Sequence, residues 1–130
     1  MNRNYSIERV EDAAWCLCRE AGMKDIFTGK RPDSAKVSRE CFAVVSVLTN
    51  MKDFEAYGKG VVRIAIYAKD LQGGVKNAPV LKEQGDRITS LLPYRTEDYL
   101  FDYSSESGFP DNSGYNIKAF NIYVMTLKWK

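Results

Sequence analysis

Residues 115–129, YNIKAFNIYVMTLKW, restrict the possible folds of this chain more than any other segment. They are typical of a long strand, in which Phe120 and Val124 fall on one face and Ala119 and Tyr123 on the other. Both faces are therefore apolar. A strand of this kind must lie deep within its own fold or be covered by a partner. The sequence thus predicts a sheet that is covered on both faces, with a subunit interface on part of it as one alternative.

Several further strands precede this one. The nearly continuous apolar run 41–48, CFAVVSVL, has the length and β-branched content of a strand buried on both faces. A short strand is expected at 23–27, another at 99–103, and residues 54–57 are either a short strand or part of a wide turn. The segment 104–114, SSESGFPDNSG, is expected to be a long polar connection.

The clearest strand follows Gly60 and has the sequence VVRIAIYAKD. Its alternating pattern predicts one apolar face and one mixed face. The apolar face carries Val62, Ile64, Ile66 and Ala68, and the mixed face carries Val61, Arg63, Ala65, Tyr67 and Lys69.

Two helices are expected. The first begins after Ser6, a residue type that favours the N-cap, and Gly22 ends it. The second begins at Pro79 and ends at Pro93. The apolar face of the first helix consists of Ile7, Val10, Ala14, Leu17, Cys18 and Ala21, and that of the second of Leu81, Gln84, Ile88, Leu91 and Leu92.

These elements predict an α+β protein with an antiparallel or mixed β-sheet and two helices packed on one face. A length of 130 residues fits one domain, residues 1–130, and no repeat or linker divides the chain. No window approaches the roughly 20 apolar residues of a membrane span. The first residues lack the apolar core of a signal peptide, so we expect an intracellular protein without membrane contact.

The residue types leave little room for catalysis. The chain has no histidine, which excludes Ser-His-Asp and Cys-His catalysis and histidine metal sites. Cys16 and Cys18 lie about 200° apart around a helix, so both thiols cannot face one metal. Acidic residues occur near the start of a strand, at Glu97–Asp98 and Asp102, and on the first helix, at Glu11–Asp12, but nothing in the sequence shows that any pair converges in a pocket. We therefore expect no catalytic residues, no metal and no cofactor.

A basic loop is the main electrostatic feature, because the formal net charge is only +2. Lys30, Arg31, Lys36 and Arg39 lie in this loop. Clustered Lys and Arg side chains are enough to contact phosphates. One hypothesis is thus a small nucleic-acid-binding module that uses the Lys30–Arg39 loop together with exposed aromatic side chains. The other reading is a solvated loop.

Aromatic side chains crowd the last third of the chain, where Phe109 and Tyr115 flank the polar segment and are expected to be exposed. Aromatic residues are enriched at protein interfaces. We therefore name two groups of candidates. The subunit-interface candidates are Arg63, Tyr67, Lys69, Phe109 and Tyr115, and the candidates for a lumen or partner contact are Lys30, Arg31, Lys36 and Arg39.

The layout of the chain resembles the phage tail-completion proteins, which comprise tail terminators and tail-to-head joining proteins. The resemblance begins with the amphipathic helix SIERVEDAAWCLCREAG and continues through IFTGKRPDS, CFAVVSVL and VVRIAIYAKD. It ends with the helix VLKEQGDRITSLL and the apolar strand NIKAFNIYVMTLKW.

The resemblance implies a structural virion-assembly protein without enzymatic activity. Such proteins form rings, typically hexamers, that complete the tail tube and join it to the head. The implied partners are further copies of the chain, the tail tube protein and the head connector, and DNA would only pass through the lumen. The implied location is the cytoplasm of the bacterial host during assembly and then the virion tail.

Overall fold

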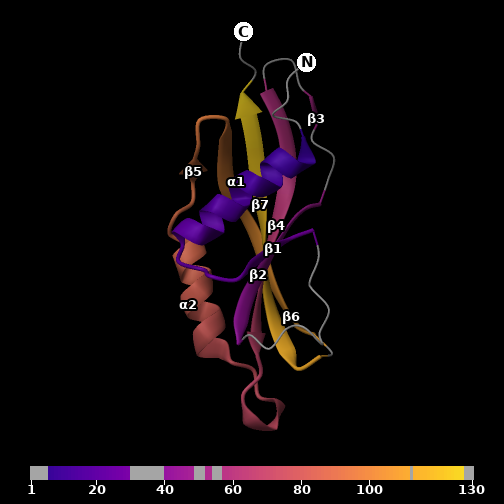
Figure 1. The fold of residues 1–130 in the computed structure, drawn as a ribbon, viewed down its shortest axis with the longest axis vertical. Coiled ribbons are helices and arrows are strands. Elements are labelled where there is room, and N and C mark those ends of the chain that lie inside the picture. The colour runs from indigo at the N-terminus through magenta and orange to yellow at the C-terminus, as the bar shows by residue number, and fades with distance from the viewer. Residues whose placement is uncertain (1–5, 30–39, 49–51, 54–56, 112, 128–130) are drawn as a thin grey trace.

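A mixed β-sheet forms the centre of the molecule, and helix α1 crosses it diagonally (Figure 1). The computed structural model describes residues 6–29, 40–48, 52–53, 57–111 and 113–127. The elements are α1 (Ile7–Glu20), β1 (Ile26–Thr28), β2 (Cys41–Val47), β3 (Lys52–Asp53), β4 (Tyr57–Lys69), the 3₁₀ turn η3 (Gln72–Gly74), α2 (Ala78–Thr89), β5 (Tyr94–Arg95), β6 (Tyr99–Asp111) and β7 (Tyr115–Leu127).

The strand order is β1-β2-β4-β7-β6-β5, and β3 pairs with one end of β4. Among the described strands, β1 and β2 run parallel and all other neighbours are antiparallel. β4 and β7 pair along their whole lengths, from Tyr57 opposite Leu127 to Lys69 opposite Tyr115. The α+β class and the mixed sheet are thus confirmed.

The larger core lies on the face of the sheet that carries Val62, Ile64 and Ile66 of β4, and we call it the core face. Its cluster also contains side chains of both helices, among them Leu17 of α1 and Ile88 of α2. The predicted apolar face of α1 is confirmed at its centre. The buried residues of α1 are Val10, Ala14, Leu17 and Cys18.

The opposite face, which we call the second face, holds two smaller clusters. One is built from Phe42, Val44 and Tyr115, and the other from Ala65, Ile117 and Ala119. The alternation predicted for β4 is confirmed, because Ala65 and Tyr67 contact the second-face clusters. The prediction of two apolar faces for β7 is confirmed over its first half. Phe120 is 1% exposed on the core face and Ala119 is 2% exposed on the second face.

The polar segment after Tyr103 is not the loop that we expected. It continues β6 as far as Asp111 and pairs with β7, so that Ser105 lies opposite Asn121 and Phe109 opposite Ile117. The register shifts between Tyr103 and Ser105, as in a β-bulge. Pairing with β7 satisfies the backbone whatever the side chains are, and this outweighs the low strand propensity of serine and glycine.

Other element boundaries differ by a few residues. β1 covers Ile26–Thr28, whereas we expected 23–27, and β4 begins at Tyr57 and not after Gly60. Helix α2 ends at Thr89, before the turn that precedes Pro93, and β5 was not expected. Residues 54–56 lie outside the described part of the chain, as does Trp129 of the final segment. No helix in the described ranges has the length and apolar character that crossing a membrane requires.

Candidate functional site

The aromatic residues of the second face form a packed cluster. The rings of Phe42 and Tyr67 stack with centroids 4.7 Å apart and an interplanar angle of 11°. Tyr115 and Phe27 meet Phe42 edge-on at 5.6 and 5.7 Å. Tyr115, which we expected to be exposed, is only 5% exposed, because this cluster surrounds it. Tyr115 therefore packs beneath the surface of the second face and is not part of its exposed area.

Arg63 and Phe109 are the two interface candidates that the fold brings into contact. The Cζ atom of Arg63 lies 5.2 Å from the centroid of the Phe109 ring. Phe109 is 38% exposed, as expected, and Arg63 is half-buried. The contact crosses β7, which separates β4 from β6. A cation over an aromatic face gains electrostatic energy from the ring quadrupole, and more so when it is shielded from water.

A second cation–aromatic pair lies on the same face. Lys59 Nζ is 5.0 Å from the centroid of Tyr123, whose side chain is 42% exposed. Both residues line a small cavity of about 110 Å³, together with Leu100, Asp102 and Met125. Lys69, at the other end of β4, is also exposed. The second face thus carries positive charge along β4.

β6 exposes an edge of the sheet. On the side away from β7, only Leu100 and Phe101 pair with a described strand, β5. Almost every residue from Asp102 to Pro110 is exposed. An edge of this kind presents unpaired backbone N–H and C=O groups to solvent. Sequence reasoning missed this edge because its residues lack the alternating apolar pattern of a strand.

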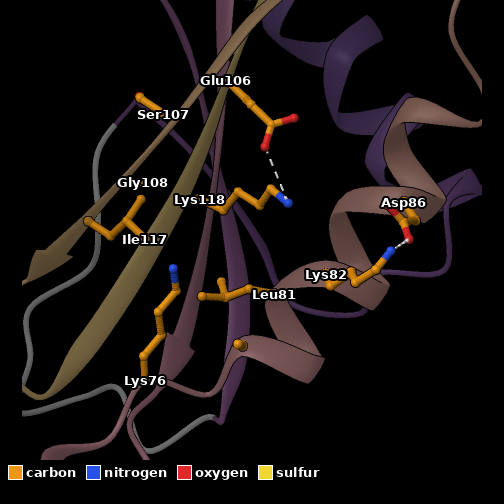
Figure 2. A pocket seen from close by; sticks show the side chains of 10 residues that line it. Lys76, Leu81, Lys82, Asp86, Glu106, Ser107, Gly108, Ile117 and Lys118 are labelled. Atoms are coloured by element: carbon orange, nitrogen blue, oxygen red, sulfur yellow. Dashed lines mark hydrogen bonds and ion pairs between the residues drawn. The ribbon is translucent and has the colours of Figure 1, made fainter.

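A cavity with a volume of about 450 Å³ lies between α2 and the β6–β7 hairpin (Figure 2). It contains two carboxylates, those of Asp86 and Glu106, and each is close to a lysine. Lys82 Nζ lies 2.7 Å from Asp86 Oδ2, and Lys118 Nζ lies 3.3 Å from Glu106 Oε2. Figure 2 shows these two pairs on different elements, with each carboxylate turned toward its own lysine.

The electrostatics of this cavity do not favour Asp86 as a general acid. A general acid needs a raised pKa, but the hydrogen bond from Lys82 lowers the pKa of Asp86. The side chain of Asp86 is also 62% exposed, so water reaches it freely. Outside the cavity, Asp98 pairs with Arg9 at 3.4 Å. Glu97 and Asp98 line a separate cavity of about 240 Å³.

Cys18 and Cys41 are not activated for nucleophilic chemistry. Burial raises the pKa of Cys18 to about 12 and is the main cause of the rise to about 11 for Cys41, so both thiols are protonated at neutral pH. Cys16 is exposed whereas Cys18 is buried, which agrees with the different helix faces that their spacing predicts. Within the described ranges, no group of three or more metal-ligating side chains gathers.

The remaining candidates are Lys30, Arg31, Lys36 and Arg39, which lie outside the described residues. A scan of the chain against protein-family models found no matching family, and a search of curated proteins found no relative. The functional argument therefore rests on the second face and the exposed edge of β6.

Proposed function

We propose that this chain is a structural protein without enzymatic activity, which assembles into a ring in the manner of the phage tail-completion proteins that its layout resembles. In this proposal both helices cover the core face and leave the second face for contacts between subunits. The ring, typically a hexamer, completes the tail tube and joins it to the head connector. Assembly takes place in the cytoplasm of the bacterial host, and the ring then remains in the virion tail.

The observation that carries the proposal is the composition of the second face. Two cation–aromatic pairs, Arg63 with Phe109 and Lys59 with Tyr123, lie partly exposed on it. Arginine and tyrosine dominate the binding energy of protein interfaces when they become fully desolvated. A surface of this kind beside an unpaired sheet edge favours association with another protein over catalysis.

The interface candidates have different roles in this proposal. Arg63, Phe109 and Lys69 contact the neighbouring subunit directly. Tyr67 and Tyr115 hold the surface in shape, because they pack around Phe42. Lys30, Arg31, Lys36 and Arg39 line the lumen or contact the neighbour, and DNA passes through the lumen without being read.

The test is the solution mass, measured by light scattering coupled to size exclusion at low and high protein concentration. We expect a discrete species of about six times the 14.8 kDa chain mass, visible as rings by electron microscopy. Binding to purified tail tubes is measured in parallel by co-sedimentation. A monomer at every concentration, together with no co-sedimentation, would contradict the proposal.

The second candidate function is nucleic-acid binding. Exposed aromatic rings with cations above them, as at Tyr123, are also used to stack bases of single strands. This alternative predicts binding of a labelled oligonucleotide at low salt that weakens steeply as salt is added. It also predicts progressive loss when Arg31, Lys36 and Arg39 are replaced. No binding at low salt would exclude it.

A further inference from the structure

Arg63 has an unusual hydrogen-bonding state. Its Nε atom is buried and has no hydrogen-bond partner among the described residues. Across the sheet, its neighbours in register are Ser46 on β2 and Asn121 on β7. The Asn121 amide already donates to Ser105 Oγ, at 3.2 Å. Nε of Arg63 is therefore a donor for which the described part of the chain supplies no acceptor.

A buried donor on a charged group is costly unless an acceptor reaches it. The Phe109 ring lies over one face of the Arg63 guanidinium. An acceptor would therefore approach the N–H groups of the guanidinium in its own plane. The Nε and Nη groups form a planar fork that matches the two oxygens of a carboxylate. A planar anion with two oxygens is therefore the ligand that matches the Arg63 fork best.

The chain itself contains a segment that is rich in carboxylates. Residues 97–111 contain five acidic side chains and no lysine or arginine, and they include the exposed edge of β6. β4, by contrast, carries Lys59, Arg63 and Lys69 and no acidic residue. The two strands have complementary charges, which favours contact between copies.

Asp102 is the acidic residue of β6 that is best placed for this contact. It is exposed, and its register partner Tyr123 places it on the second face. Its Oδ1 atom accepts a hydrogen bond from the backbone N–H of Tyr103, at 2.8 Å. No described side chain forms an ion pair with it. Glu106, by contrast, already pairs with Lys118.

We propose that the fork of Arg63, backed by Phe109, binds the carboxylate of Asp102 from a neighbouring copy of this chain. This assignment rests on the proposed self-association and names the residue pair at its centre. Because Nε is buried in the unbound chain, the Arg63 side chain has to turn outward for Nε to meet the carboxylate. Binding would then remove both charges from water together. It predicts a bidentate contact for which lysine, as a point charge, is a poor substitute.

The first experiment compares self-association of the wild type with that of Arg63→Lys and Asp102→Asn, by light scattering over a concentration series. Each variant should weaken association at least tenfold. Arg87→Lys is the matched control, because Arg87 on α2 pairs with Glu83 of its own chain, and it should leave association unchanged. If the wild type associates and Arg63→Lys associates equally well, the assignment is wrong and the ring proposal is unaffected.

The second experiment does not depend on ring formation. A labelled synthetic peptide of residues 97–111 is titrated with the full chain and followed by fluorescence anisotropy. We expect binding that weakens at least tenfold with Arg63→Lys, or with the Asp102→Asn peptide. Peptide binding through Arg63 by a chain that stays monomeric would support the site and count against the ring. No peptide binding in a monomeric wild type, or Arg63-dependent binding of an oligonucleotide in its place, would overturn the carboxylate assignment.

Discussion

β4 and β6 are strands of 13 residues each, and they flank the same partner, β7, on opposite sides. β4 is central, because β2 and β3 pair with its other side, and its core-face residues Val62, Ile64 and Ile66 are fully buried. β6 is an edge strand over most of its length, and its second half is polar and exposed. The comparison shows that the position of β4 is determined by packing in the core. The second half of β6, by contrast, is exposed to solvent and is accessible to a partner.

The largest effect should come from the core face of β4. Ile64→Ala removes a fully buried side chain, and we expect it to lower the free energy of unfolding by about 2–5 kcal/mol. Ser107→Ala on β6 is exposed and should change it by no more than about 0.5 kcal/mol. Urea unfolding of the two variants measures both values. Equal losses of unfolding free energy in the two variants would show that β4 and β6 do not differ in packing.

An intermediate effect should come from the turn that joins β6 to β7. Gly114 has a φ of 90°, a region that side chains with a Cβ atom rarely adopt. Gly114→Ala should therefore cost about 1–2 kcal/mol in the free energy of unfolding. Gly108→Ala is the control within β6, because its added Cβ would come no closer than 3.7 Å to the Ile117 carbonyl. It should be neutral or stabilising, and a large loss there would mean that β6 is packed more tightly than described.

A smaller effect should appear at alkaline pH. Cys18 packs in the larger core, and its pKa is about 12 because burial disfavours the thiolate. The unfolded chain ionises near the ordinary pKa of 9.0, so this contribution to stability is fully present below pH 9 and is lost between pH 9 and 12. From pH 8 to pH 10, stability should fall by on the order of 1 kcal/mol through this group.

The control for this pH dependence is Cys18→Ala, which removes the titrating group. It should lower stability at pH 8 because it leaves a small cavity. It should also reduce the alkaline decline seen by urea unfolding to the part that the raised pKa of Cys41 contributes. Cys16 is exposed, so Cys16→Ala should leave the decline unchanged. The same decline in both variants would show that ionisation of Cys18 does not limit the stability of the core.

The sequence predicted the parts of the fold in which side chains decide the structure. In β4 the alternation of apolar residues determines which side faces the core, and the helical spacing in α1 does the same for Val10 and Leu17. The strand character of 104–111 could not be predicted, because it comes from backbone pairing with β7 and not from the local side chains.

The candidate site was predictable only in pieces. Arg63 and Phe109 each stood out in the sequence, but their contact depends on the register of a strand that was expected to be a loop. The exposed edge of β6 was missed for the same reason, because this segment was not expected to be a strand. Tyr115 was misplaced for a related reason, because its burial depends on Phe42, which is far away in the sequence and near in the sheet.

The central claim is that the second face and the edge of β6 form the surface on which another copy binds. Amide hydrogen exchange, measured by residue at low and high protein concentration, tests it directly. We predict that backbone amides within 102–111 which do not pair with β7 exchange quickly in the dilute chain and become protected at high concentration. Amides of the core strands should stay unchanged. Exchange of residues 102–111 that is the same at both concentrations would contradict the account.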